Sequence, residues 1–427
     1  DVYKRQISLL GLNKTEIMNM RKNIFIILIC FAYLSTYAQK ETSNWTFGAN
    51  CGLTWNTTRS LACTGLAGTP NATLSGLPNN ITSSLNNLEG CATLSNSDGV
   101  LTFYTDGMRL FYKGVAIATD LLGHISSAQS GVFCPYPGSP EKCFVIAVGA
   151  MRANNLSYTV AYEDQYGGWI ESGKKNILFQ GAKGLTGENI AVVHHQNGQD
   201  YWVIAVGQGG YEISPSYFNA WLVTKNGVST TPVSTSFNLA YRDQFGSSGY
   251  LKISPNGRRF ILATYPDNRF WYGDFNSATG AFSNIKSIAD FNGTDLARPY
   301  GVEFSSDQSV VYFTDENGLY AFKADELFAS NNISTVTKKK YSFTSTFGNS
   351  GAIQLGPDKR IYWSKTGTKY MYIIDNANDY NNIKIYQTPN NFLLGNCTTG
   401  LPTFSASWFS TPRGVMPVNP TLRTKSY

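Results

Sequence analysis

One phrase of sequence, repeated along the chain, limits the possible folds more than any other feature. It is clearest between Gly249 and Ala263, where two apolar runs, 250–253 and 260–262, flank the turn Ser254-Pro255-Asn256-Gly257. Proline presets φ at the first corner of a tight turn, and Asn and Gly accept positive φ at the next positions. Two apolar strands around such a turn make a β-hairpin. A hairpin is therefore the predicted building unit.

Related turns recur along the chain, with spacings of 39, 60, 59, 51 and 51 residues. They lie at Gly99, Pro137-Gly138, Asn197-Gly198, Asn256-Gly257, Asp307-Gln308 and Asp358-Lys359. Periods of this length, each with several strands, are typical of a β-propeller. Six turns are visible, and the strand around Trp45 can share a further blade with the C-terminal segment 401–404. The sequence predicts an all-β propeller of seven blades; six or eight blades and a double β-sandwich are the alternatives.

The composition agrees with an all-β chain. Aromatic residues make up 14% and charged residues only 15%, and 26 Tyr and 25 Phe far outnumber 6 Met. Aromatic residues suit pleated strands, and the 40 Gly suit frequent turns. One short helical turn is expected at 325–329. Residues 56–87, rich in Thr, Ser, Asn and Gly, are expected to form a long loop.

The N-terminal residues 18–38 have the pattern of a signal peptide. A basic start at Met20-Arg21-Lys22 precedes an apolar run of 11 residues, 24–34, and small residues before Gln39. A membrane span needs about 18 apolar residues, so this run is too short to be one. We expect cleavage after Ala38, which divides the chain into upstream residues and signal peptide (1–38), a propeller (39–410) and a tail (411–427). The product is expected to be secreted or held at the cell surface, with the periplasm as the alternative.

The charge gives little support for a nucleic-acid partner. The formal net charge is +6 over 427 residues, and it is scattered. The one basic run, Lys338-Lys339-Lys340, is interpreted as a solvated loop or edge strand.

Six cysteines remain after the signal peptide, and an even number in an exported chain suggests disulfides. Cys134 and Cys143 flank a Pro-rich turn, so a bridge is expected across that hairpin. Cys51 and Cys63 form a plausible local pair. A bridge between Cys91 and Cys397 would then tie an early strand to a late one. No metal site is predicted, because C-x-x-C spacing is missing and no His lies near any of these cysteines.

Several phrases, in order along the chain, resemble a family of secreted propellers associated with gliding motility and type IX secretion. The first is Leu88-Glu89-Gly90-Cys91-Ala92, and the others are 99–107, 126–130, 195–203, 249–252, 300–305 and 355–358. The resemblance covers about residues 44–405 and implies a seven-bladed propeller of the WD40/YVTN type without established catalytic residues. Longer members of the family continue into immunoglobulin-like repeats and a C-terminal sorting domain, whereas this chain ends at Tyr427.

Candidate catalytic residues can be named, each beside a structural interpretation. His195 stands near Asp200 as a general base would, but the Asn197-Gly198 turn explains the same spacing. Asp106 and Glu188 are carboxylates near strand ends that could act as a pair in a glycan hydrolase or lyase. Solvated loop carboxylates are the plainer interpretation. No cofactor is predicted.

Loop aromatics are the better indication of function. Tyr211 and Tyr217 belong to one polar, aromatic stretch, and Arg269 and Trp271 to another. Aromatic and Arg side chains on loops suit a protein or glycan partner, although Trp271 suits core packing as well. The sequence therefore favours a non-enzymatic surface binding module; a carboxylate-dependent glycan-active enzyme is the alternative.

Overall fold

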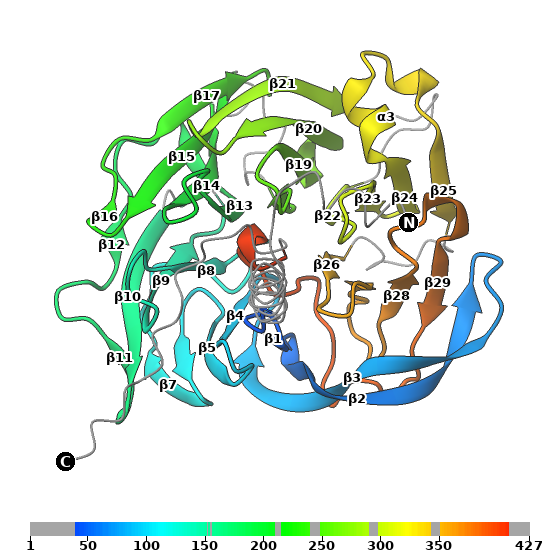
Figure 1. Ribbon diagram of the computed structural model, residues 1–427, viewed down its shortest axis with the longest axis horizontal. Coiled ribbons are helices and arrows are strands. Elements are labelled where there is room, and N and C mark those ends of the chain that lie inside the picture. The colour runs from blue at the N-terminus through cyan, green and yellow to red at the C-terminus, as the bar shows by residue number, and fades with distance from the viewer. Residues whose placement is uncertain are drawn as a thin grey trace, which may run out of the picture. The chain divides into compact units, whose positions relative to one another are not determined.

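The computed structural model describes residues 39–409 except positions 152, 154–155, 210–214, 240–247, 290–297 and 343–350. The described residues from Lys40 onward belong to one compact unit. The expected signal peptide and the tail after residue 410 lie outside the described residues, so the expected domain boundaries stay predictions. Within this unit, antiparallel sheets follow one another in chain order around a ring (Figure 1). The predicted all-β propeller is confirmed.

Five of the six sheets in the described residues have four or five strands, and each follows the chain as a meander. The first contains β4 (Ala92–Ser95), β5 (Leu101–Thr105), β6 (Leu110–Tyr112) and β7 (Val115–Ala118). The second contains β8 (Gly131–Pro135), β9 (Lys142–Val148), β10 (Leu156–Asp164), β11 (Gly167–Ile170) and β12 (Ile177–Leu178). The third contains β13 (Leu185–His194), β14 (Tyr201–Gln208), β15 (Ser216–Thr224), β16 (Gly227–Val228) and β17 (Val233–Phe237). The fourth contains β18 (Leu251–Ile253), β19 (Arg259–Thr264), β20 (Arg269–Asn276) and β21 (Ala281–Ile288). The fifth contains β22 (Val302–Phe304), β23 (Val310–Asp315), β24 (Gly318–Lys323) and β25 (Lys338–Ser342).

The sixth sheet joins the two ends of the ring. Its late strands are β26 (Ile353–Leu355), β27 (Ile361–Trp363), β28 (Tyr372–Asp375) and β29 (Lys384–Gln387). Its early strands are β1 (Asn44–Phe47), β2 (Ala49–Leu66) and β3 (Ala72–Asn86). The end of β2 pairs with β29, and β1 and β3 pair with β2. The long loop expected at 56–87 was therefore wrong, because these residues form most of the β2–β3 hairpin. The group β1–β3 occupies the place expected for a shared blade, and the count of seven stays a prediction.

Helical structure is scarce in the described residues. The helical turn expected at 325–329 is confirmed as α3 (Ala324–Ala329), and the short 3-10 turns are η1 (Tyr265–Asp267), η2 (Ile333–Thr335), η3 (Tyr380–Asn382) and η4 (Ala406–Phe409). No helix of the described residues has the length and apolar character that crossing a membrane requires.

The repeated turn has a related backbone in each of the first five sheets and in the late strands of the sixth. In five of these six turns the positive-φ residue donates its N–H to the carbonyl three residues before it, and in the second sheet Ser139, after Gly138, is the donor. The residue at its tightest corner has positive φ throughout: Gly99, Gly138, Gly198, Gly257, Gln308 and Lys359. Side chains of the turn supply the same hydrogen bonds. In the fourth sheet Asn256 Oδ1 accepts from the Arg258 N–H, and in the fifth Asp307 Oδ1 accepts from the Ser309 N–H. The predicted repeat is therefore a structural repeat.

The hydrophobic core lies between neighbouring sheets. Phe218 of the third sheet packs on Phe260 of the fourth, with ring centroids 4.8 Å apart. Phe270 of the fourth sheet packs on Phe313 of the fifth at 4.3 Å. Each sheet thus buries its apolar faces against the next one, and for this reason the row of sheets must close into a ring.

The centre of the ring is filled by the chain itself. Residues 401–409, here called the central segment, run through it and appear red in Figure 1. At one end, Leu401 exchanges hydrogen bonds with the Tyr250 hydroxyl, at 2.9 and 3.0 Å. In the middle, the Thr403 N–H donates to the Cys91 carbonyl at 2.8 Å. At the other end, Ser407 Oγ accepts from the His194 N–H at 2.8 Å. The central segment therefore ties early, middle and late sheets together.

All six described cysteines are free and buried, so the expected disulfides are wrong. Cys134 pairs in register with Phe144, and Cys143 pairs with Pro135. Cys134 and Cys143 therefore point to opposite faces of their sheet, because side chains alternate along a strand. Burial raises the pKa of the Cys143 thiol, which keeps it protonated and slow to oxidise.

The other two expected bridges fail for different reasons. Cys51 and Cys63 lie on the same strand, β2, twelve positions apart. At about 3.3 Å per residue they are separated by tens of ångström, whereas a disulfide needs Cα atoms within about 7 Å. The backbone of Cys91 pairs in an isolated parallel β-bridge with Pro402, which lies five positions beyond Cys397. The Cys397 thiol contacts the Tyr370 carbonyl instead. Pairing of β2 with β29 closes the ring, and the central segment ties its sheets together along the axis, without a disulfide between the described cysteines.

Candidate functional site

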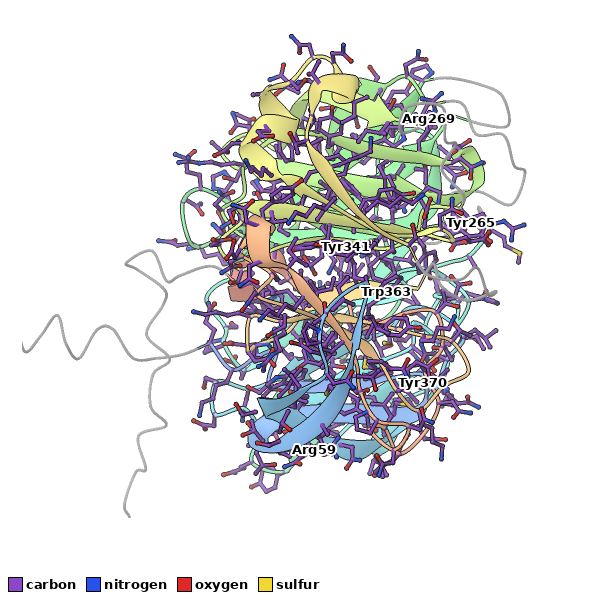
Figure 2. The ribbon with its side chains drawn as sticks, turned by 90° about the vertical axis from the view of Figure 1, so that its right-hand side faces the viewer. Arg59, Tyr265, Arg269, Tyr341, Trp363 and Tyr370 are labelled. Carbon is purple, nitrogen blue, oxygen red and sulfur yellow. The ribbon has the colours of Figure 1, made fainter. Side chains whose placement is uncertain are left out.

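The sheets present two distinct edges at the two ends of the ring. In an antiparallel meander, successive turns alternate between the two ends of the strands. The repeated first turns, such as 254–257, therefore share one edge. The second turns and the connections between sheets share the other, here called the mouth edge. Figure 2 shows Tyr265 and Tyr370, both from second turns, toward the same edge of the ring.

A cluster of polar side chains lies on the mouth edge. Its members lie in or beside the segments that lead into the innermost strands, and in each of their sheets the innermost strand is the first along the chain. It consists of Glu89, Ser126, Glu188 and Tyr300 and is here called the mouth cluster. The Tyr300 hydroxyl donates to Glu89 Oε2 at 2.8 Å, and Ser126 Oγ donates to Glu89 Oε1 at 3.3 Å. Tyr300 precedes β22 and Glu89 precedes β4, so this hydrogen bond links the fifth sheet to the first.

Glu188 is the most strongly perturbed carboxyl of the cluster. It lies on β13, is 4% exposed, and accepts the N–H of Ala128 at 2.8 Å and of Met151 at 3.0 Å. Burial raises its pKa to about 8; the two N–H groups oppose this rise, and the negative charge of Glu89 adds to it. Burial likewise raises the pKa of Glu89, while its bonds from Tyr300 and Ser126 lower it. Glu188 therefore holds a proton near neutral pH and positions two segments of the second sheet.

The rim of the mouth cluster carries an aromatic ring and two basic side chains. The Tyr265 and Tyr300 rings meet edge to face, with centroids 6.4 Å apart. The Arg298 guanidinium lies 5.8 Å from the centre of the Tyr265 ring and pairs with Glu316 at 3.0 Å. His124 is exposed, and its Nδ1 accepts from the Ser126 N–H. Glu89 and Tyr265 are only partly buried.

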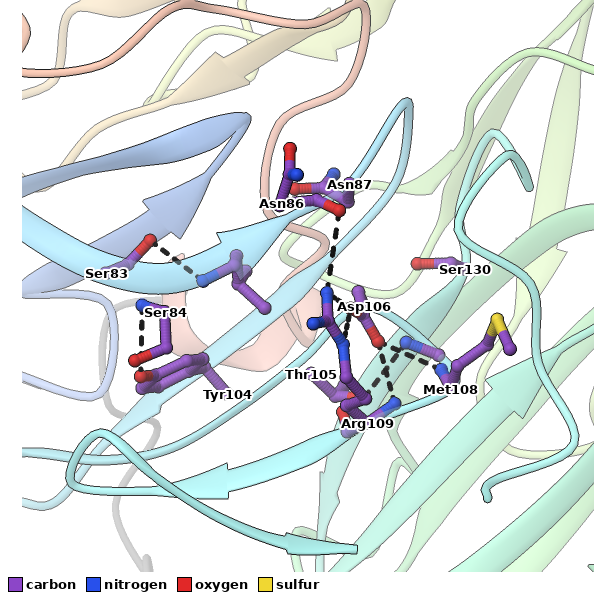
Figure 3. A network of polar contacts seen from close by, with 12 residues as sticks. Ser83, Ser84, Asn86, Asn87, Tyr104, Thr105, Asp106, Met108, Arg109 and Ser130 are labelled. Carbon is purple, nitrogen blue, oxygen red and sulfur yellow. Dashed lines mark hydrogen bonds and ion pairs between the residues drawn. The ribbon is translucent and has the colours of Figure 1, made fainter. Parts of the chain in front are cut away.

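Asp106, expected as a catalytic carboxylate, has a structural role. Its Oδ1 accepts the N–H groups of Met108 and Arg109, and its Oδ2 pairs with the Arg109 guanidinium at 2.6 Å (Figure 3). The same guanidinium reaches the Asn86 carbonyl, at the end of β3. Asp106 therefore fixes the second turn of the first sheet and fastens it to the β2–β3 hairpin, and its side chain is fully buried.

His195, named as an alternative catalytic residue beside a structural interpretation, lies at the edge opposite the mouth. It belongs to the first turn of the third sheet, where its Nδ1 accepts from the Asn197 N–H and its Nε2 contacts the Ala278 carbonyl. Asp200 is held by the Asn197 side chain at 2.7 Å. His195 and Glu188 are therefore on opposite edges, and Asp106, Glu188 and His195 do not form one catalytic group.

The four expected binding residues have different environments. Trp271 is 5% exposed, packs against Phe237 and donates to Thr264, so the core-packing interpretation holds and Trp271 is not an exposed binding residue. Arg269 is partly exposed and donates to Ser287. Tyr217 is partly exposed beneath the Lys183 ammonium. Tyr211 lies outside the described residues.

Residue types at strand ends did not reveal Glu89, Tyr265, Tyr300 or His124 as site residues. A usable signal was present, because the phrases containing Glu89 and Tyr300 each precede an innermost strand. In a ring of meanders the starts of the innermost strands converge around the axis, so polar residues there come together.

The described part of the chain does not gather three His, Cys, Asp or Glu side chains in the way a metal ion needs. The mouth cluster contributes only two such groups, Glu89 and Glu188, and both already accept hydrogen bonds. The sequence-based expectation that the chain uses no metal or cofactor stays a prediction.

Comparison with protein-family models and with curated protein sequences gave no match. Solved structures of similar fold share little sequence. A protein from Bacteroides uniformis assigned as a 6-phosphogluconolactonase is 12% identical, with a TM-score of 0.46 over 80% of this chain and 97% of its own. The periplasmic gluconolactonase PpgL of Pseudomonas aeruginosa is 12% identical, with a TM-score of 0.40 over 69% of this chain and 81% of its own. Similarity at this level says nothing about activity, and the resemblance to gliding-motility propellers stays a prediction.

Proposed function

We propose that this chain is an exported, non-enzymatic propeller that binds a protein or glycan partner at the cell surface through the mouth edge. The observation that carries the proposal is the presence of a partly exposed carboxylate, Glu89, and a partly exposed aromatic ring, Tyr265, on the same edge, at the end of a filled channel. Hydroxyl-rich and amide-rich surfaces suit such a combination, because the carboxylate accepts hydrogen bonds while the ring packs against C–H groups. The signal-peptide pattern supports export, and the resemblance supports the gliding-motility context.

The filled channel favours binding over passage or deep capture. The central segment enters beside Glu89, where a Cβ on Gly400 would lie 2.1 Å from the Glu89 carbonyl oxygen. A ligand therefore meets a shallow, closed floor and contacts the rim. Specificity then depends on rim residues such as Tyr265 and Arg298.

A glycan array and pull-down from cell-surface extracts test the proposal with three variants. Glu89→Gln and Tyr265→Ala should each weaken binding about tenfold or more, as expected for losing a charge-assisted bond or an aromatic contact worth about 1.5 kcal/mol. His195→Gln, on the opposite edge, is the matched control and should bind as the unmodified protein does. Equal binding by all four proteins would refute the role of the mouth edge.

The alternative is a carboxylate-dependent hydrolase or lyase acting on glycans. The observation that favours it is Glu188, a carboxyl with a pKa of about 8 beside a second carboxyl, because enzymes use such pairs as acid and base. A substrate panel of glycans and sugar lactones, run beside the array, distinguishes the two. Turnover that is lost in Glu188→Gln would establish the enzyme and overturn the binding module.

A further inference from the structure

Three polar residues occupy equivalent positions on the innermost strands of three consecutive sheets. Lys252, Glu303 and Gln354 are each the middle residue of a three-residue strand, on β18, β22 and β26. Because the positions are equivalent, the three side chains come together at the ring centre beside the central segment. All three are buried, with exposed fractions of 8%, 6% and 0%.

The three side chains are in direct contact. The Lys252 ammonium lies 3.1 Å from Glu303 Oε2 and also contacts Gln354 Oε1. The Gln354 Nε2 donates to the Leu355 carbonyl at 3.1 Å, which turns the amide carbonyl toward Lys252. Glu303 accepts the N–H of Phe304 at 3.0 Å and of Leu355 at 3.0 Å. The Lys252 nitrogen is thus held against both the amide oxygen of Gln354 and the carboxylate of Glu303.

Most of the surrounding side chains are apolar. A cavity of about 20 Å³ adjoins the three side chains, and its other walls include Ile190, Leu251, Leu355, Phe404 and Phe409. That volume holds one molecule of the size of water or ammonia.

We propose that Lys252 and Gln354 join in an intramolecular isopeptide bond with Glu303 as the proton carrier. The Lys252 ammonium gives one proton to Glu303, and the neutral Nζ attacks the Gln354 Cδ. The Nζ–Cδ bond forms, a second proton moves from Nζ to Nε2, and the Cδ–Nε2 bond breaks. The nitrogen leaves as ammonia, takes the proton held by Glu303, and departs as ammonium. No oxidant or other reagent is needed.

The bond would clamp the fourth and sixth sheets across the fifth. It would serve the purpose expected of the disulfides, which is a covalent restraint on the ring of an exported chain. Unlike a disulfide, it is insensitive to reductant. It rests on side chains away from the mouth cluster, so it is independent of the proposed binding function.

Peptide mapping by mass spectrometry of the purified full chain tests the bond directly. After trypsin digestion, Lys252 should be uncleaved and joined to the peptide carrying Gln354, with a combined mass lower than the sum by one ammonia. Recovery of the free peptide ending at Lys252, together with the free peptide carrying Gln354, would overturn the proposal. This readout uses the unmodified protein and does not depend on how any variant folds.

Variants then test the role of Glu303. Glu303→Gln keeps the size of the side chain but cannot carry the proton, so both peptides should be recovered free. Lys113→Met, which removes a lysine from an exposed ion pair with Glu163, is the matched control and should retain the cross-link. A cross-link that persists in Glu303→Gln would refute the assigned proton carrier.

Discussion

The central segment ties the sheets of the ring together, which predicts a large effect of the substitution Phe404→Ala. Phe404 is 4% exposed, and its ring lies 6.0 Å from Trp45 and 6.3 Å from Trp408. It thus joins the central segment to β1. Truncating a buried Phe to Ala typically costs about 3–5 kcal/mol, which is a large part of the 5–15 kcal/mol stability of a typical domain. We expect the free energy of unfolding to fall by about that amount.

The strands that lose protection distinguish a loosened ring from the general cost of removing a buried side chain. Urea unfolding followed by Trp fluorescence measures the total, and hydrogen exchange shows which amides lose protection. Phe282→Ala is the control, because Phe282 is 5% exposed and packs on Phe218 within the third and fourth sheets. Phe404→Ala should loosen β1 and β4 first, and Phe282→Ala should not. Unchanged protection of β1 and β4 in Phe404→Ala would refute the role assigned to this segment, as would a midpoint that reductant lowers in the unmodified protein.

Three further perturbations test other parts of the structure. Burial raises the pKa of Glu188 from its ordinary value of 4.5 to about 8, so the folded state holds the proton more tightly than the unfolded state. Stability should be full below pH 4.5 and decline up to pH 8, by at most about 1.4 kcal/mol per pH unit. Urea midpoints across that range should show this slope, and Glu188→Gln should remove it; a flat profile in the unmodified protein contradicts the assignment. Lys359→Gly should raise stability by about 0.5–1 kcal/mol, because exposed Lys359 has φ +67° where four of the other five repeats have Gly. Thermal unfolding checks this, with Gly257→Ala (φ +67°) as the opposite case that should lose stability. Asp106→Asn should lower the free energy of unfolding by about 1–2 kcal/mol, measured in urea, because the ion pair with Arg109 is lost. Partner binding should stay unchanged. Loss of binding without loss of stability would show that Asp106 takes part in binding.

The sequence predicted the turns well because their chemistry is local. A Pro, Asn or Gly at a fixed place determines the backbone within four residues, and all six repeated turns have the expected positive φ. The disulfides failed because pairing depends on which face of a strand each residue occupies. Cys134 and Cys143 are close in sequence and on adjacent strands, yet the register places them one position out of phase. The β2–β3 hairpin was missed because its Thr-, Ser- and Asn-rich strands lack the apolar alternation that marks a half-buried strand.

The candidate site was only partly predictable for a related reason. Glu188 and His195 are seven positions apart, but β13 spans the sheet between them and carries them to opposite edges. Conversely, Glu89 and Tyr300 are far apart in sequence and meet because both stand just before an innermost strand. The sequence near strand ends shows which residue types are available for a site. The edge on which a given residue lies follows only when the strands of its sheet are counted.

The central segment connects the stability of the ring with the proposed function in one element. Residue 400 lies against the Glu89 backbone, Leu401 is bonded to Tyr250, and Ser407 reaches His194 at the other edge. Whatever holds this segment in place therefore also holds the backbone that presents the Glu89 carboxylate. A ring held in this way has its axis occupied. The proposed binding function therefore assigns recognition to the mouth edge, where the innermost strands begin and where a carboxylate, an aromatic ring and a guanidinium lie. The same geometry places Lys252, Glu303 and Gln354 where no partner can reach them, which fits a role in holding the ring and not in recognition.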